Sequence, residues 1–396
     1  MNVPTHPRRP LLALMLGGLA LGMTEFMPMG LLPEIAQSLQ VTIPQAGHLI
    51  SAYAIGVVIG APVLVGLGDA VPPRKLLAAL MLMFGICNAL FAIAPTYELL
   101  FVTRLFAGLP HGAFFGLGAV VATRLAGPGR ASSAVATMFA GLTVANIVGV
   151  PLGTWLGHAS HWRVPFLLVA AVAGLAAWAI ARWLPALPIS REGGVLAALR
   201  MFAVRRLWLI IGISAIGTGG LYAWISYIAP MVTQVTGIAS ADMSAVMMLA
   251  GIGMALGNWL GGRIADRISP LRATMLMMLV MAATSVLVAL CAHWKLPTLA
   301  LTFVTGAVAF SVIAPMQMVM IEHAPGSRTL ASAMIQSTSN IGNALGAYLG
   351  GVAIAAGFGM TSPLYVGAGL AFVGALLALV LLRITRVPAE AAQPAP

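Results

Sequence analysis

One carboxyl group lies deep inside a long apolar stretch of this chain, where a membrane helix normally carries no acid. It belongs to Glu25, in the sequence GMTEFMPMGLLPEI that begins at Gly22. The chain has nine acidic residues, and we place the other eight at the ends of apolar stretches, in loops or in the tail. An acid in the hydrocarbon layer costs about 3 kcal/mol, so it faces the protein interior and marks a functional site. A carboxyl group there can bind and release a proton.

Other kinds of chemistry find no support in the residue patterns. The sequence has no Gly-x-Ser-x-Gly and no His-Glu-x-x-His motif, which argues against a membrane hydrolase or metalloenzyme. Cys87 and Cys291 lack metal-ligand spacing and are expected to pack as small apolar side chains. A channel would need rings of like residues around a pore, which one deep acid does not provide. We expect no enzyme activity, no cofactor and no metal.

The composition indicates a protein that crosses the membrane many times. Of 396 residues, 60% are hydrophobic and 7% are charged, and the mean hydropathy is +1.01. Such a chain is too apolar to cover its surface as a soluble globule. The net charge of +11 comes from short basic clusters between apolar stretches, without a basic stripe or a recognition motif. We therefore expect the lipid bilayer, and no nucleic acid, as a partner.

Twelve apolar stretches are long enough to span the bilayer. Dividing 396 residues by 12 leaves 33 for each helix and its connection, and a spanning helix takes about 20 of them, so no soluble domain fits. We predict an all-α membrane protein. The predicted spans are 11–33, 44–68, 76–94, 98–123, 132–157, 163–183, 207–235, 242–265, 273–292, 297–320, 329–356 and 361–383.

The basic residues predict the orientation of these spans. Of 20 Lys and Arg residues, 17 lie at one set of alternate loops and at the two termini. The opposite loops hold only Arg163 and Lys295, and Arg104 lies within a span. Because positively charged loops stay in the cytoplasm, we expect both termini and the central connector there.

The chain also repeats itself. Asp69 and Asp266 are 197 residues apart, and the Pro-Gly pairs that open the fifth and eleventh spans share that offset. The repeat predicts two pseudo-symmetric six-helix bundles, at 1–183 and 207–396, the second with a short cytoplasmic tail. A cytoplasmic linker at 184–206, whose end could form a short basic amphipathic helix, joins them. Parallel repeats of this kind are typical of secondary transporters.

Three stretches carry a family resemblance: TEFMPMGLLPEIAQSL in the first span, LYAWISYIAP in the seventh and ASAMIQSTSNIGNALGAYLGG in the eleventh. They resemble the major facilitator superfamily, most closely its bacterial drug:proton antiporters of the arabinose-efflux-permease and sugar-efflux branch. The resemblance extends over the whole chain. It implies the major facilitator fold in a bacterial inner membrane, and we expect a monomer.

Superfamily motifs at the cytoplasmic ends of helices imply gating residues. GGRIADRISPLR after the eighth span keeps Asp266 and Arg267 of the inner-loop signature. VGLGDAVPPRK after the second span keeps Asp69, Arg74 and Lys75 but departs from the signature at two other positions. An Asp beside an Arg at a helix end can form a salt bridge that exists in one conformation and breaks in the other. A solvated loop turn is the alternative.

A third set of gating residues, Gly149, Pro151 and Gly153, resembles the antiporter motif through NIVGVPLG in the fifth span. Glycines four residues apart let helices approach closely in lipid, and Pro151 frees a backbone carbonyl. Close packing alone would explain the glycines, so the direction of transport rests on the resemblance.

The resemblance also supplies partners for Glu25. At a rise of about 1.5 Å per residue, Glu25 and Arg104 lie about 12 and 10 Å from the outer surface. The first and fourth helices line one cavity in this family, so the two could pair, and His111 could extend a polar path inward. Burial disfavours an ionised carboxyl group and a nearby guanidinium favours it, so movement of Arg104 or arrival of substrate would switch Glu25 between protonated and free. A static pair that fixes helix packing is the alternative.

Other mid-span side chains offer hydrogen bonds and ring faces to a substrate. Amides suit hydroxylated solutes, and rings suit lipophilic drugs, although each side chain could instead join helices. The predicted substrate contacts are Tyr53, Trp224, Tyr227, Asn258, Gln317, Asn340 and Asn343.

These features predict proton-coupled efflux of a small solute, sugar-like or lipophilic and drug-like, by alternating access. The partners are then protons and a small molecule. An uptake symporter or a facilitator for a small metabolite is the alternative.

Overall fold

A computed structural model describes residues 8–67, 71–126, 130–188, 205–323 and 328–386. These residues form helices and short connections, with no strand among them. Eleven candidate spans within the described ranges are long and apolar enough to cross a membrane. The chain is thus a multi-pass helical membrane protein, as its hydropathy predicted.

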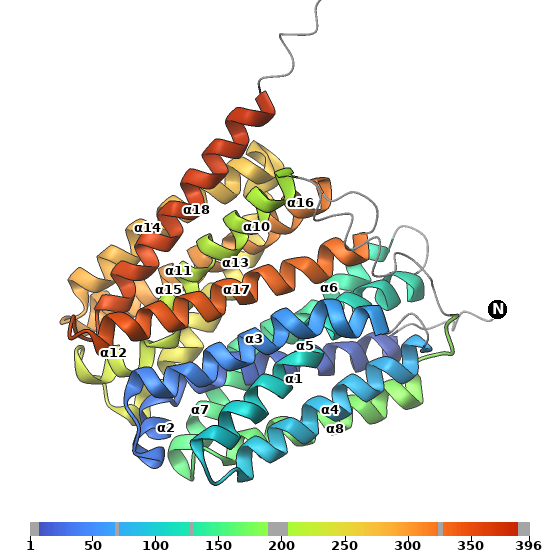
Figure 1. Ribbon diagram of the computed structural model, residues 1–396, viewed down its shortest axis with the longest axis horizontal. Helices are drawn as coiled ribbons and strands as arrows, with labels where there is room; N and C mark the ends of the chain where they lie inside the picture. Colours follow the sequence, from blue (N-terminus) through green and yellow to red (C-terminus); the bar gives the residue numbers. More distant parts are fainter. Residues whose placement is uncertain (1–7, 68–70, 127–129, 189–204, 324–327, 387–396) are drawn as a thin grey trace, which may run out of the picture.

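The elements follow one another as nearly antiparallel rods (Figure 1). In the first half they are α1 (Arg8–Gly30), α2 (Leu32–Leu39), α3 (Ile43–Leu67), α4 (Pro73–Ile93), α5 (Tyr97–Leu125), α6 (Ala131–Val144), the π-helical turn η2 (Ala145–Gly149), α7 (Val150–Ala159) and α8 (Val164–Trp183). In the second half they are α10 (Arg205–Gly217), α11 (Gly219–Ser226), α12 (Ile228–Gln234), the 3₁₀ turn η3 (Ser240–Asp242), α13 (Met243–Ile268), α14 (Pro270–Cys291), α15 (Lys295–Ser311), α16 (Ile313–His323), α17 (Arg328–Ala355) and α18 (Ser362–Arg386).

The predicted spans agree with these helices to within a few residues, and prolines explain most of the interruptions. The seventh span breaks at Tyr227, three residues before Pro230, and the tenth breaks at Val312, three residues before Pro315. A proline ring lacks an N–H and collides with the carbonyl one turn earlier, so the helix restarts there. In the fifth span η2 immediately precedes the turn that contains Pro151, where a wider turn relieves the same conflict.

The eleventh predicted span, 329–356, corresponds to the 28-residue helix α17, which is not among the eleven apolar candidates. The amphipathic helix predicted at the end of the linker falls within 189–204 and lies outside the described residues.

Glycines allow the same close helix contact in both halves. A Cβ added to Gly56 or Gly60 on α3 would collide with backbone carbonyls of α5, and one added to Gly253 or Gly257 on α13 would collide with carbonyls of α15. Gly253 follows Gly56 by 197 residues, and Gly257 follows Gly60 by the same offset. These contacts fix the helices on either side of the molecular centre.

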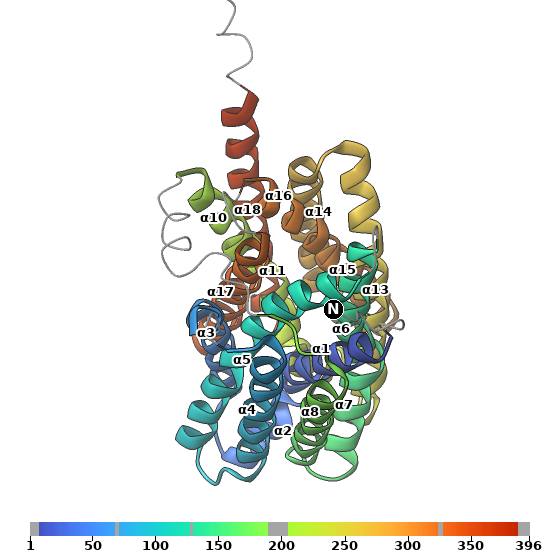
Figure 2. The ribbon, with the colours of Figure 1, turned by 90° about the vertical axis from the view of Figure 1, so that its right-hand side faces the viewer.

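The two halves of the chain meet in the middle and at the predicted outer end. Ser51 Oγ donates a hydrogen bond to the Ala344 carbonyl across the boundary, over 3.2 Å, and Gly47 on α3 lies against the Tyr227 hydroxyl at the start of α12. In Figure 1 the halves lie at an angle and come together where α2, α7 and α12 are labelled. Figure 2, turned by 90°, shows most first-half helices below and the second-half helices above.

Arg163, in the loop between α7 and α8, anchors the end of the first half that is predicted to face outward. Its guanidinium donates hydrogen bonds to the carbonyls of Ala92 and Ala94, over 3.1 and 2.6 Å, where α4 ends. It also lies 4.5 Å from the ring centroid of Trp162. These contacts occupy carbonyls that a helix end leaves without partners.

We expect Arg163→Ala to lower the free energy of unfolding by about 1–2 kcal/mol, because charge-assisted hydrogen bonds are lost. Denaturant titration of the purified protein in detergent measures this. Arg383→Ala, at an exposed position on α18, is the control. Equal stability of the two variants would contradict the anchoring role.

Candidate functional site

Glu25 lies on α1 with 5% of its surface exposed, at the boundary between the two halves. Its Oε1 accepts a hydrogen bond from the Tyr222 hydroxyl over 3.0 Å, and a longer one from Asn343 Nδ2 over 3.5 Å. Tyr222 belongs to α11 and Asn343 to α17. The deep acid of the first half is therefore held by donors from the second half.

Ring contacts support this placement. The Phe26 ring stacks against Tyr222, with centroids 6.3 Å apart, and also lies 6.0 Å from the Phe310 ring of α15. An apolar wall on one side of the carboxyl group excludes water and strengthens its hydrogen bonds.

Arg104 on α5 is 1% exposed and does not form the direct pair with Glu25 that the sequence suggested. No ion pair joins them among the described residues. The guanidinium instead donates to the Leu49 and Thr24 carbonyls, over 3.4 and 3.3 Å, and lies 4.4 Å from the Tyr53 ring centroid. Its Nη1 has no hydrogen-bond partner in the described structure. Arg104 thus reaches the backbone of Thr24, the residue before Glu25, rather than the carboxylate.

His111 lies on α5 like Arg104, and Tyr53 of α3 contacts both of them. The Tyr53 hydroxyl lies 2.7 Å from His111 Nδ1, and the imidazole is 1% exposed. Tyr53, predicted as a substrate contact, therefore presents its ring to Arg104 and its hydroxyl to His111. The three predicted residues form one buried polar line beside Glu25.

The other predicted substrate contacts divide into two groups. Trp224 is buried with no partner for its indole Nε1, and Asn343 Oδ1 and Asn340 Oδ1 also lack partners among the described residues. Tyr227 donates to the Ala347 carbonyl over 2.6 Å and is committed to helix packing.

Asn258 and Gln317 lie apart from this group. Asn258 is exposed on α13 and Gln317 is half-buried on α16. No hydrogen bond within the described structure connects either of them to the site around Glu25.

The predicted gating residues lie elsewhere. Asp69 is outside the described residues. Arg74 donates to the Leu184 carbonyl over 3.4 Å, at the start of α4. Lys75 is exposed there, and Asp266 and Arg267 are exposed at the end of α13, without an ion pair in the described part of the chain.

The glycines of the fifth span hold α1 in place. A Cβ added to Gly149 would crowd the Met23 side chain, and one added to Gly153 would collide with Met27. Pro151 is buried between them. Since Glu25 lies midway between the two methionines, these glycines set how closely α1 approaches α7.

Sequence reasoning missed Tyr222, Asn88 and the pair formed by Glu34 and His158. Tyr222 follows Glu25 by 197 residues, so the repeat offset itself was a signal. Asn88, fully buried on α4, joins the Thr24 hydroxyl through a hydrogen bond. Asn88 Nδ2 also donates to the Phe84 carbonyl over 2.9 Å.

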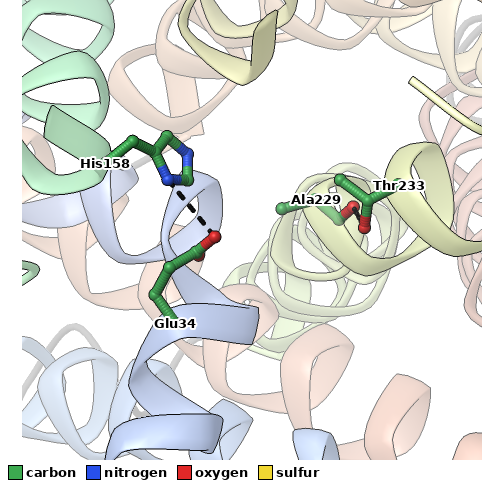
Figure 3. A network of polar contacts seen from close by, with 4 residues as sticks. All are labelled: Glu34, His158, Ala229 and Thr233. Atoms are coloured by element: carbon green, nitrogen blue, oxygen red, sulfur yellow. Dashed lines mark hydrogen bonds and ion pairs between the residues drawn. The ribbon is translucent and has the colours of Figure 1, made fainter. Parts of the chain in front are cut away.

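Figure 3 shows the pair formed by Glu34 and His158, in which His158 Nδ1 of α7 lies 3.2 Å from Glu34 Oε1 of α2. The nearby helix α12 carries Thr233, whose hydroxyl donates to the Ala229 carbonyl. The pair ties the short helix after α1 to the end of α7, at the end where the two halves meet.

The sequence matches a family model described as Major Facilitator Superfamily, over residues 14–326 and 207–396. The transporter AraJ of Escherichia coli is 37% identical over 350 residues, 88% of this chain and 89% of that protein. A chloramphenicol resistance protein of Streptomyces lividans is 30% identical, over 96% of this chain and 99% of that one. A protein named as a sugar efflux transporter in Mannheimia succiniciproducens is 28% identical, over 92% of each.

The fold resembles a solved bacterial homologue of the human lysosomal transporter Spinster, in an inward-facing and occupied conformation. The TM-score is 0.74 at 16% identity, covering 96% of this chain and 98% of that chain. At this identity the likeness concerns the fold.

We expect Tyr222→Phe and Glu25→Gln to be non-additive in the free energy of unfolding, with a coupling of about 0.5–2 kcal/mol, because the two side chains share one hydrogen bond. The Phe variant keeps the ring stacked on Phe26 and removes only the hydroxyl. A double-mutant cycle in detergent measures the coupling. Tyr365→Phe, an exposed tyrosine on α18, should be additive with Glu25→Gln. Additivity in both cycles would contradict the contact.

Proposed function

This chain belongs to the Major Facilitator Superfamily, as its motifs suggested, and we propose that it exports a small solute in exchange for protons by alternating access. The family and the relatives are transporters, so the protein is a transporter and not an enzyme. One observation carries the proposal: Glu25, the deep acid of the first half, accepts its hydrogen bonds from Tyr222 and Asn343 of the second half.

This arrangement links a proton to the relative position of the halves. The Tyr222 and Asn343 donors remain at Glu25 only while the halves stay in contact, so opening at this level breaks both bonds. Protonation removes the carboxylate charge that these donors stabilise. Proton binding therefore changes the free-energy difference between the two conformations, and the conformation changes the proton affinity by the same amount.

The buried polar line of Arg104 and His111 from α5 and Tyr53 from α3 supports a polar path inward from Glu25. Arg104 lies over the Tyr53 ring, and the Tyr53 hydroxyl meets His111. In the proposed mechanism Arg104 holds the negative charge near α1, and its unpaired Nη1 donates a hydrogen bond to the anionic Glu25 carboxylate when α1 moves. The hydrogen bond between the Tyr53 hydroxyl and His111 Nδ1 fixes the orientation of both side chains beside Arg104. The roles of all three residues are proposals.

The surroundings of Glu25 support a solute with an apolar body and a few polar groups. Phe26 and Tyr222 offer aromatic surface, and Asn343 Oδ1 is an acceptor without a partner in the described structure, as Trp224 Nε1 on the helix of Tyr222 is a donor without one. Chloramphenicol resistance and sugar efflux in the names of two relatives agree with drug-like or sugar-like export. A thermal-shift screen of both compound classes separates them.

The repeated contacts support the two-bundle organisation. Glu25 and Tyr222, Gly56 and Gly253, and Gly60 and Gly257 are all related by 197 residues. We therefore propose two pseudo-symmetric six-helix bundles at 1–183 and 207–396, in which α17 also crosses the membrane and brings the number of spans to twelve, and 184–206 is a cytoplasmic linker. The proposal includes a monomer in a bacterial inner membrane with both termini cytoplasmic. Gating by the inner-loop residues and by the fifth-span glycines is part of it.

We expect Glu25→Gln to abolish transport against a gradient and substrate-induced proton release, because the amide copies the shape of the protonated acid but cannot release a proton. Exchange of substrate for substrate need not change protonation and should survive. Proteoliposomes with an imposed pH gradient measure uptake and counterflow of the solute selected by the thermal-shift screen. Glu98→Gln, at an exposed position on α5, is the matched control.

Three outcomes would decide against this mechanism. Normal proton-driven transport by Glu25→Gln at wild-type protein levels would remove the proton role and leave the fold intact. Solute movement in the same direction as the proton flow would identify an uptake symporter. Counterflow without any proton dependence would identify a facilitator.

A further inference from the structure

A groove runs between α4 and α8 at the predicted cytoplasmic end, away from Glu25. Its volume is about 560 Å³, and α4 contributes Arg74, Lys75 and Leu82 while α8 contributes Gly174 and Trp178. Alanines from both helices complete the lining. Figure 2 shows α4 and α8 side by side, on the side of the first half that faces away from the second half.

The walls of the groove are apolar and open to the surroundings. Leu82 is 55% exposed and Trp178 is 56% exposed. A Cβ added to Gly174 would meet no atom within 4 Å, so the floor has room for further atoms. Large apolar side chains left exposed beside such a space in a membrane protein are covered by lipid chains.

The mouth of the groove is positively charged. Arg74 and Lys75 lie at the start of α4, and Arg182 is exposed in the last turn of α8. Arg74 is held by its hydrogen bond to the Leu184 carbonyl, which follows α8. No acidic side chain is among the described residues that line the groove. The position, at the ends of two spanning helices, is the depth of lipid headgroups.

We propose that this groove binds an anionic phospholipid. The phosphate lies between Arg74 and Lys75, and an acyl chain runs past Leu82 and over Gly174 against the Trp178 ring. A zwitterionic lipid offers the same chain but no net charge to the two cations, so the site discriminates by headgroup. Basic pockets between spanning helices recognise anionic headgroups in this way.

Native mass spectrometry of the purified full chain tests the proposal, with phosphatidylglycerol and phosphatidylcholine of identical chains added in equal amounts. We expect wild type to prefer phosphatidylglycerol. Each of the two cations at the bound phosphate contributes about a fivefold preference, so Arg74→Gln with Lys75→Gln should reduce it by up to about thirtyfold. Arg272→Gln with Arg383→Gln, two exposed basic residues of α14 and α18, should leave it unchanged.

A second variant fills the groove without changing its charge. Gly174→Leu should weaken binding of both lipids, since it occupies the path of the acyl chain. Gly369→Leu on α18 is the matched control, because a Cβ there also meets no atom within 4 Å. The proposal is overturned if wild type binds the two lipids equally, or if the groove variants retain the preference and occupancy of their controls.

Discussion

The structure depends on a carboxyl group of one half that takes its hydrogen bonds from the other. Glu25 is too deep for water to solvate it cheaply, and the two donors within reach of it, Tyr222 and Asn343, come from α11 and α17. A buried acid without donors would cost several kcal/mol. The contact between the halves is therefore also the solvation of the acid, and any movement that separates them must provide other partners for it.

The close approach of α1 to its neighbours follows from that requirement. Gly149 and Gly153 let α7 lie against Met23 and Met27, so that the turn of α1 bearing Glu25 is held from behind. The π-helical turn η2 ends at Gly149, within this contact, and Pro151 interrupts the regular hydrogen bonds in the next turn. Packing and backbone irregularity thus occur together on the helix that positions the acid. A helix with a full i to i−4 ladder and larger side chains would hold α1 further from α7.

Hydropathy predicted the helices well because each span must satisfy its backbone internally and match the bilayer. The breaks within the spanning helices were harder to predict from the sequence. Pro230 and Pro315 are visible in the sequence, but Pro110 lies inside the continuous helix α5, so a proline alone does not predict a break. Glu25 stood out because a charge in lipid is rare. Tyr222 did not, because a tyrosine in an apolar stretch looks like packing until its hydroxyl is seen to meet a carboxylate. The partners of Arg104 could not be predicted either, because equal depth in the membrane does not determine the direction in which a side chain points.

The site around Glu25 contains more polar capacity than the protein itself uses. Near Glu25, Arg104 Nη1 and Asn343 Oδ1 are buried and have no partner among the described residues, and the same is true of Trp224 Nε1 on α11, the helix that carries Tyr222. Each such group costs about 1–3 kcal/mol when left unpaired. In a static core this cost would have no compensation. In a transporter a solute supplies the missing partners as it binds, and the binding energy gained in this way depends on how the halves place these groups. We therefore propose that the unpaired atoms near the acid are where solute recognition and proton binding act on the same contact between the halves.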